Sequence, residues 1–334
     1  MTNAYRTAAA ALIAANDILI TTHINPDGDG IGSGLALVLA LEAMGKRVRF
    51  LCPSKVASLY EFLPRFAAIK ICEDEAVAKT EAPAEVIISC DAGDIQRLGA
   101  VWHAPRTTFI NLDHHATNTR FGDINLVDIA AASSGVVVMT LLDHMGVSVT
   151  PPIAENLYTT IVFDTGRFMH SNTTAAVFRV AAELLDTGID ASAINRRLTY
   201  TRTVKDLTLQ KLAIEHLVAD EAEPRLAGIT LTQAAVAAAG GEPDDWGDLV
   251  EVPRSLRGNE IAYLVRERTA KDGSPVCKLS LRANPPYEVG HVAQRFGGGG
   301  HVQAAGATVP GTMATVLPEL LPLLRAACAA IPRV

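Results

Sequence analysis

The sequence lacks the features of a membrane-bound, secreted or disulfide-stabilised protein. No uninterrupted apolar run approaches the roughly 18 residues that a membrane-spanning helix needs. No basic segment precedes the first apolar stretch, so we expect a helix there and not a secretory signal. The five cysteines are an odd number without metal-binding spacing, which disfavours both a disulfide framework and a zinc site. We therefore expect a cytoplasmic protein.

Aromatic side chains and net positive charge are also scarce. Aromatic residues make up 5% of the chain, and the formal net charge is −7. This balance disfavours bulk electrostatic coating of nucleic acid. Nor do basic and aromatic residues interleave as they do in proteins that track a long single strand. A small anionic substrate is still compatible with the composition, because local cations or metal ions can hold it.

The length of 334 residues suggests about two domains, at roughly 150 residues per domain. In the first half, runs rich in β-branched residues alternate with helix-like segments. The expected strands are 17–22, 47–52, 86–91 and 107–113, and the expected helices are 31–44, 134–146, 152–163 and 174–187. This alternation predicts an α/β fold whose N-terminal domain has three layers and a mainly parallel sheet.

The second half shows a different order of strand-like and helix-like segments. Residues 189–219 read as one or two helical segments and predict a connector. Beyond it, the pattern predicts a smaller α+β domain with strands at 226–232, 261–268 and 276–282 and helices at 288–296 and 312–329. The expected division of the chain is therefore 1–190, a helical linker over 191–220, and 221–334.

Acidic and histidine residues gather where the predicted strands of the first half end. In parallel sheets, ligands bind beyond the carboxyl ends of the strands, so residues there are expected to meet in space. A further aspartate ends a predicted helix. The four clusters are His23 with Asp27 and Asp29, then Asp91, then Asp113-His114-His115, and finally Asp164.

So many carboxylates in one place would repel one another and raise their pKa values, a problem that divalent metal ions remove. Carboxylates and imidazoles without thiolates suit Mn²⁺ or Mg²⁺ better than structural zinc. Six candidate ligands favour two ions that share a carboxylate, an arrangement used in phosphoryl hydrolysis. Simpler interpretations stay open for single residues: Asp29 as a helix N-cap and Asp27 as a turn residue.

In this order, the four clusters resemble the motifs of the DHH phosphoesterase family. Residues 280–306, which include RFGGGGH, resemble the signature of that family's DHH-associated C-terminal domain. The segment DTGRFMHSNTT (164–174) resembles the corresponding segment of one subgroup of this family. That subgroup consists of oligoribonucleases that degrade nanoRNA and also dephosphorylate 3′-phosphoadenosine 5′-phosphate (pAp). The resemblance thus implies a catalytic metal-binding domain followed by a substrate-binding domain.

The resemblance also implies roles for single residues. One Mn²⁺ would take His23, Asp27 and Asp91, and the other would take Asp29, Asp91, His114 and Asp164. Asp91 would bridge the two ions, with Mg²⁺ or Co²⁺ as alternative metals. His115 would face the substrate phosphate, and Asp113 would orient a ligand.

The glycine run before His301 reads either as a flexible turn or as a close backbone approach to a ligand, and the resemblance favours the ligand. The family pattern Ser-x-Arg-Ser is here Ser280-Leu281-Arg282-Ala283, so one hydroxyl is missing. Ser33, Asn118 and Ser134 are secondary site candidates, and Arg167 could pair with the carboxylates or with substrate. The expected substrate-binding residues are Arg97, Arg282, Gly298, Gly299, Gly300 and His301.

Together these features predict a hydrolase in which a hydroxide activated by two metal ions attacks a phosphoester. Its expected substrates are pAp, converted to AMP, and short oligoribonucleotides, converted to 5′-mononucleotides. Alternatives are a phosphodiesterase for cyclic di-AMP or pApA, an inorganic pyrophosphatase, a single-strand DNA exonuclease, and a non-catalytic nucleotide sensor. A homodimer is expected from the resemblance alone.

Overall fold

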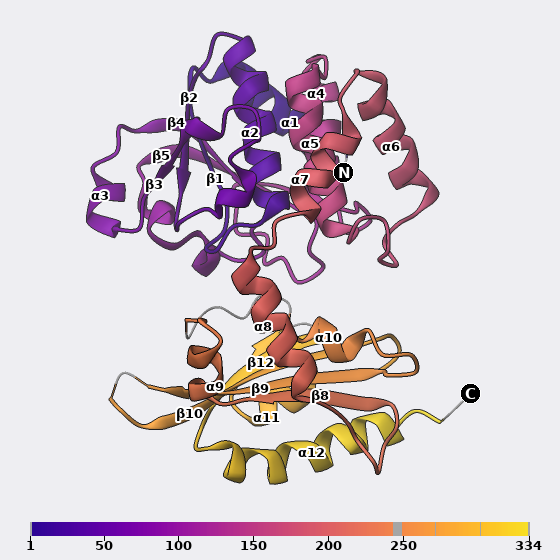
Figure 1. Ribbon diagram of the computed structural model, residues 1–334. Coiled ribbons are helices and arrows are strands. Elements are labelled where there is room, and N and C mark those ends of the chain that lie inside the picture. The colour runs from indigo at the N-terminus through magenta and orange to yellow at the C-terminus, as the bar shows by residue number, and fades with distance from the viewer. Residues whose placement is uncertain (1, 243–248, 271, 301, 333–334) are drawn as a thin grey trace. The chain divides into compact units, whose positions relative to one another are not determined.

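The computed structural model describes residues 2–242, 249–270, 272–300 and 302–332. The chain forms two compact units, one up to Thr201 and the other from Arg202 (Figure 1). Within the described ranges, every helix is too short or too polar to cross a membrane.

The first unit is built on a six-stranded parallel sheet with the strand order β3-β2-β1-β4-β5-β6. The order reverses between β1 and β4, and in open α/β sheets ligands bind at such a switch point. The predicted fold class is confirmed. The strands are β1 (Asp17–Thr21), β2 (Arg47–Cys52), β3 (Ile69–Ile71), β4 (Ala84–Cys90), β5 (Arg106–Asp113) and β6 (Ile124–Val127).

Side chains alternate between the two faces of this sheet because successive strand residues point to opposite sides. Ile18 and Ile20 of β1 pack into the larger core, whereas Leu19 packs into the smaller one. The larger core contains α1 (Thr2–Ala14), α2 (Gly28–Ala43), α4 (Ser134–His144), α5 (Pro151–Asp164), α6 (Ala175–Asp186) and α7 (Ala191–Thr199). The smaller core is covered by α3 (Glu75–Lys79) and the 3₁₀ helix η3 (Ile95–His103).

The second unit contains a mixed sheet with the order β11-β12-β10-β9-β8-β7, in which only β8 and β9 of the described strands pair in parallel. Its strands are β7 (Leu217–Ala219), β8 (Leu226–Leu231), β9 (Ile261–Thr269), β10 (Pro275–Ala283), β11 (Gly299–Gly300) and β12 (Ala304–Pro310). Helices α11 (Gly290–Arg295) and α12 (Met313–Ala329) cover one face (Figure 1). The other face packs against α8 (Val204–Glu215), α9 (Gln233–Ala238) and α10 (Glu251–Arg254).

The sequence pattern missed several short elements and one longer strand. β3 and β6 have three and four residues, too few to show a period. β12 has seven residues and pairs with β10, but its sequence AAGATVP is rich in alanine and glycine, which are depleted in strands. Pairing between strands, and not local propensity, therefore places β12 in the sheet.

Candidate metal centre

The loop after β1 leads directly into α2, and Asp27 fixes where that helix begins. Its carboxylate accepts hydrogen bonds from the backbone amides of Asp29 (3.0 Å) and Gly30 (3.3 Å), which makes Asp27 the N-cap. The alternative in which Asp29 caps this helix is therefore wrong. Asp27 combines a capping role with a side chain that also lies 3.7 Å from Nε2 of His23.

Asp29 instead binds the start of a different helix. Its buried carboxylate accepts hydrogen bonds from the backbone amides of Ser134 (2.6 Å) and Gly135 (3.1 Å), in the first turn of α4. The hydroxyl of Ser33 donates to it as well, at 3.3 Å. Helix N-termini attract negative charge, so α4 holds this carboxylate in a fixed position. Two secondary candidates from the sequence, Ser33 and Ser134, thus contact the cluster.

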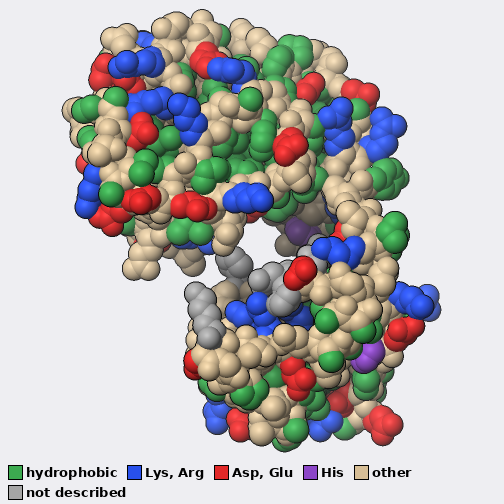
Figure 2. All heavy atoms as spheres, turned by 60° about the vertical axis from the view of Figure 1, so that its left-hand side comes forward, with side chains coloured by type: hydrophobic (Ala, Val, Ile, Leu, Met, Phe, Trp, Pro, Cys, Tyr) green, Lys and Arg blue, Asp and Glu red, His purple; other side chains and the backbone are tan. Residues whose placement is uncertain are grey.

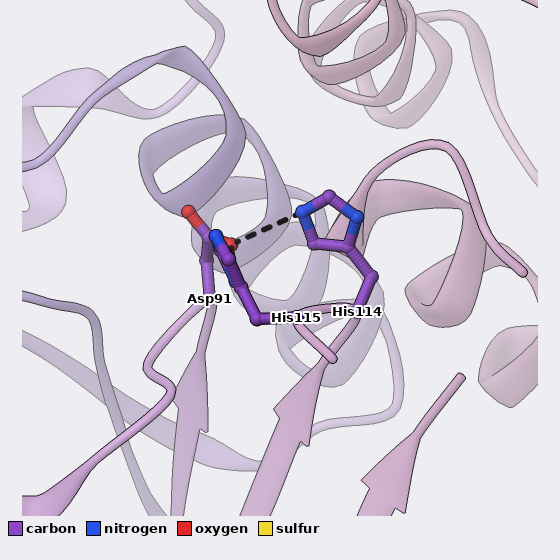
Figure 3. Close-up of side chains that lie close together, drawn as sticks. All are labelled: Asp91, His114 and His115. Atoms are coloured by element: carbon purple, nitrogen blue, oxygen red, sulfur yellow. Dashed lines mark ion pairs between the residues drawn. The ribbon is translucent and has the colours of Figure 1, made fainter. Parts of the chain in front are cut away.

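Asp91 lies between the histidines that follow β1 and β5, and its backbone is left-handed, with φ of 62°. Its carboxylate oxygens lie 3.3 Å from Nε2 of His23 and 3.7 Å from Nε2 of His114. Ser134 donates its hydroxyl hydrogen to Asp91 Oδ1 at 3.1 Å. Figure 3 shows Asp91, just beyond β4, facing His114 and His115, just beyond β5.

Among the described residues, three groups of side chains place one ligand atom each within 4.8 Å of one another. Asp91 belongs to two of the groups, and His114 also belongs to two. The groups are His23 with Asp27 and Asp91, Asp29 with His114 and Asp164, and Asp91 with His114 and His115. All six predicted metal ligands are therefore brought together, although they are spread over four segments of the chain.

The electrostatics of this cluster fit divalent cations. Burial, aided by the charges of Asp91 and Asp164, raises the pKa of Asp29 well above its ordinary value. Burial opposes the charged form of His23, but the nearby carboxylates of Asp27 and Asp91 raise its pKa to about 10. Without metal ions, bound protons thus offset part of the negative charge of these crowded carboxylates. Divalent ions would offset them instead, and ligands of carboxylate and imidazole without thiolate suit Mn²⁺ or Mg²⁺.

The neighbouring residues of the Asp-His-His segment make different contacts. Nε2 of His114 lies 3.0 Å from Asp164 Oδ2, inside the cluster. Nδ1 of His115 lies 2.8 Å from Asp113 Oδ1, and Asn118 donates to the other Asp113 oxygen at 2.5 Å. Asp113 is buried, and these contacts hold the pKa of its carboxyl below the usual range despite burial. Asp113 therefore orients the His115 ring.

The two arginines of the first unit lie in different surroundings. Arg97 Nη2 lies 2.7 Å from His23 Nδ1, which in turn lies 2.9 Å from the carbonyl oxygen of Ile24. Nδ1 can accept from Arg97 or donate to Ile24, depending on the tautomer. Arg167 instead points to the carbonyl oxygen of Leu198 in α7, at 3.5 Å. The structure thus places Arg97 at the cluster and directs Arg167 elsewhere.

In the second unit, a hollow of about 640 Å³ lies over β10, β12 and the glycine loop. Its charged lining residues in the described part of the chain are all basic: Arg266, Lys278 and Arg282. Lys278 and Arg266 are direct partners in the β9–β10 ladder. Like charges opposite each other are destabilising, so this pairing favours a bound anion. Figure 2 shows lysine and arginine side chains gathered on one face of this unit.

Neither Lys278 nor Arg266 stands in a recognisable motif. The signal that could have found Lys278 is the alternation Lys278, Ser280, Arg282, which puts three polar side chains on one face of a strand. Arg282 also lies 3.6 Å from Glu251 and is about one-third exposed.

The glycines of the loop differ in whether the surrounding structure leaves space for a side chain. A Cβ on Gly298 would lie 2.1 Å from the carbonyl oxygen of Gly306, and Gly300 has a φ of 133°. Internal packing and backbone conformation therefore require glycine at both positions. Gly299 has an ordinary φ and nothing within 4 Å of the same point, so it borders open space. His301 lies outside the described residues.

Comparison with known families identifies both halves of the chain. The model of the DHH family N-terminal domain matches residues 17–161, and the model of the DHHA1 domain matches residues 230–330. The bifunctional oligoribonuclease and PAP phosphatase NrnA of Thermus thermophilus is 34% identical over 297 residues, which cover 88% of this chain and 84% of the relative. The protein of the same description from Bacillus subtilis is 25% identical and covers 87% and 89%.

Solved structures agree on the fold. An exopolyphosphatase-related protein from Bacteroides fragilis superimposes with a TM-score of 0.87 at 24% identity, covering 99% of this chain and 96% of that one. RecJ of Thermus thermophilus, solved in complex with Mn²⁺, superimposes with a TM-score of 0.56 at 15% identity. That match covers 98% of this chain and 55% of RecJ.

Proposed function

This chain belongs to the DHH family, and from that membership we propose that it is a metal-dependent phosphohydrolase acting on short nucleotides. Its reactions are the degradation of short oligoribonucleotides to 5′-mononucleotides and the removal of the 3′-phosphate from pAp. The observation that carries this proposal is the convergence of six carboxylate and imidazole ligands at the switch point of the sheet. The names of the relatives from Thermus thermophilus and Bacillus subtilis supply the substrate class.

We assign two divalent ions, most simply Mn²⁺, to this cluster. His23, Asp27 and Asp91 would hold one ion, and Asp29, His114 and Asp164 would hold the other with Asp91 shared between them. When bound, such a pair supplies Lewis acidity and positive charge to the oxygens of a reacting phosphoester.

His115 is one of two residues of the first unit that we assign to substrate binding. Asp113 holds its Nδ1 at 2.8 Å, which fixes the ring and raises the pKa of the imidazole. In the doubly protonated ring Nε2 also carries a hydrogen and donates it to a phosphoryl oxygen. Arg97 is assigned a related role. If Nε2 of His23 is a metal ligand, its Nδ1 carries the proton and donates to Ile24, so Arg97 no longer has an acceptor there. Its guanidinium then suits a substrate phosphate.

The second unit would hold the nucleotide by its phosphate groups. Arg282 and Lys278 line the basic hollow, and an arginine fork matches phosphate oxygens in pairs. Gly299 lets a ligand approach the backbone, because its missing side chain leaves open space. Gly298, Gly300 and His301 belong to the same proposed loop. We place the catalytic domain at 1–190, the linker at 191–220 and the substrate domain at 221–334.

The basic hollow also suits related nucleotides that carry two phosphates. The proposed substrates therefore extend to pApA and cyclic di-AMP, with pAp and short RNA as the main ones. A homodimer, drawn from the family resemblance, and a cytoplasmic location, expected from the sequence composition, complete the proposal.

A parallel hydrolysis assay tests this function. Wild-type protein and the Asp91→Ala variant are each incubated with Mn²⁺ and pAp, a 5′-labelled diribonucleotide, cyclic di-AMP or pyrophosphate. We expect AMP from pAp and mononucleotides from the diribonucleotide, and no product with the variant. Hydrolysis of pyrophosphate and of no other substrate would show that the protein is a pyrophosphatase and not a nucleotidase. Tight nucleotide binding without turnover would indicate a sensor.

A further inference from the structure

Asn111 is a buried amide in the middle of the parallel sheet. It lies on β5 two residues before Asp113 and has no exposed surface. Strands of this kind, covered on both faces, are normally built from valine, isoleucine and leucine. An amide removed from water needs hydrogen-bond partners, so its presence calls for an explanation in what it contacts.

The Asn111 side chain holds the backbone just beyond Asp91. Its Nδ2 donates to the carbonyl oxygen of Ala92 at 2.9 Å and to the hydroxyl of Ser89 at 3.3 Å. Asn118 donates to the same carbonyl at 3.2 Å. The backbone amide of Asp91 donates to Leu112 at 2.9 Å, so contacts from β5 and its following loop fix both sides of this turn.

The turn needs such support because Asp91 has a left-handed backbone with φ of 62°. This conformation is uncommon for residues with a Cβ, although aspartate tolerates it better than most. If the chain after β4 relaxed toward an ordinary extended conformation, the Asp91 carboxylate would point in another direction. That carboxylate belongs to two of the three ligand groups.

We propose that Asn111 is a positioning residue of the metal centre, which holds the turn after β4 and thereby aims the Asp91 carboxylate at the shared metal position. This inference rests on the proposed function, since it assumes that Asp91 is a ligand. Partners that orient metal ligands typically change metal affinity or activity by about 10- to 100-fold when they are removed.

The chain offers a matched control in Asn156 of α5. It too has no exposed surface, and its Nδ2 also makes two hydrogen bonds, to the carbonyl oxygens of Pro64 (3.3 Å) and Pro152 (3.0 Å). In both residues Oδ1 has no hydrogen-bond partner among the described part of the chain. Asn156 therefore shares the burial and hydrogen bonding of Asn111 without contacting the turn at Asp91.

The test compares N111L with N156L in the full-length chain, using Mn²⁺ as the only ligand. Free Mn²⁺ is titrated by electron paramagnetic resonance without substrate, and thermal unfolding is recorded on the same samples. We expect the Mn²⁺ dissociation constant to rise about tenfold in N111L and to stay within twofold of wild type in N156L, with similar losses of thermal stability. In turnover, the Mn²⁺ concentration for half-maximal rate should rise while KM for pAp is unchanged.

If N111L does not fold, N111V takes its place, since a β-branched residue suits a buried strand. Equal Mn²⁺ affinity in the Asn111 and Asn156 variants would overturn the positioning role while leaving the proposed function intact. Failure of the wild-type protein to bind Mn²⁺ would overturn the proposed function itself.

Discussion

The two units collect charged side chains in opposite ways. The first unit draws carboxylates and imidazoles from four separate segments into a mostly buried cluster, in which Asp27 and Asp29 also bind the starts of α2 and α4. The second unit presents its cations from neighbouring strands, with Lys278 and Arg282 on one strand and Arg266 on the next. The acidic cluster is thus interlocked with the backbone, whereas the basic hollow is a strand surface.

This difference teaches where substitutions should be severe and where they should be graded. In the acidic cluster, each side chain has several partners, so one change disturbs ligands, caps and charge balance together. In the basic hollow, Lys278 and Arg282 act through partly solvated side chains, so changes there should be small and nearly additive. Four predictions test this contrast.

The largest effect is expected for Asp91→Asn. This change keeps the shape of the side chain but removes the charge shared by two ligand groups. We expect kcat on pAp to fall by about 10³-fold, which corresponds to several kcal/mol of lost charge stabilisation. Asp94→Asn is the matched control. That nearby aspartate caps η3 and accepts a hydrogen bond from the Thr119 hydroxyl, but it belongs to none of the three ligand groups, so the variant should retain activity within about twofold. Comparable losses of kcat in both variants would contradict the assignment of Asp91 as a shared metal ligand.

Mn²⁺ itself should stabilise one unit and not the other. At a concentration 100 times its dissociation constant, a ligand that binds only the folded state adds about 2.7 kcal/mol. Amide hydrogen exchange with Mn²⁺ or with a chelator should therefore show greater protection in β4 and β5 and unchanged protection in β9 and β10. The increase should vanish in Asp91→Asn. A gain that is equal in both units would contradict the assignment of the ions to the first unit.

The glycine loop offers a sharper test within the second unit. An alanine at Gly298 would bring its Cβ to 2.1 Å from Gly306 O, so Gly298→Ala should lower the free energy of unfolding by about 1–3 kcal/mol. Gly299→Ala meets open space and should change stability by less than about 0.5 kcal/mol while raising KM for pAp. Urea unfolding and KM are measured for both variants. Unchanged KM in Gly299→Ala would show that no ligand approaches that residue.

The smallest effect is expected for single lysines of the second unit. Lys278→Ala should raise KM for pAp about threefold, in line with the roughly 0.2–1 kcal/mol of a partly solvated ion pair. Lys211→Ala removes a cation of α8 that is outside the hollow and should leave KM unchanged. The difference between the two variants should shrink as salt is added, because ions screen exposed charges. Equal KM values at low salt would exclude Lys278 from substrate binding.

Much of the fold could be predicted because long periodic segments carry their own signal. The strands at β1, β2, β5, β9 and β10 and the helices α4, α5, α6 and α12 were expected within a few residues of their observed bounds. β12 could not be found, since its alanines and glycines resemble a loop and pairing with β10 and β11 makes them a strand. Its position matters, because β12 forms part of the floor of the basic hollow.

The candidate site divides in the same way. The sequence by itself determined the ligand types and their order, because Asp91, His114 and the residues after β1 follow strands whose carboxyl ends must share one edge of a parallel sheet. Only the tertiary structure decided that Asp27 and not Asp29 caps α2, that α4 holds Asp29, and that Asn111 contacts the turn at Asp91. Those contacts join segments that are distant in the chain, and strand register and helix placement, which bring such segments together, are set by packing and not by local sequence.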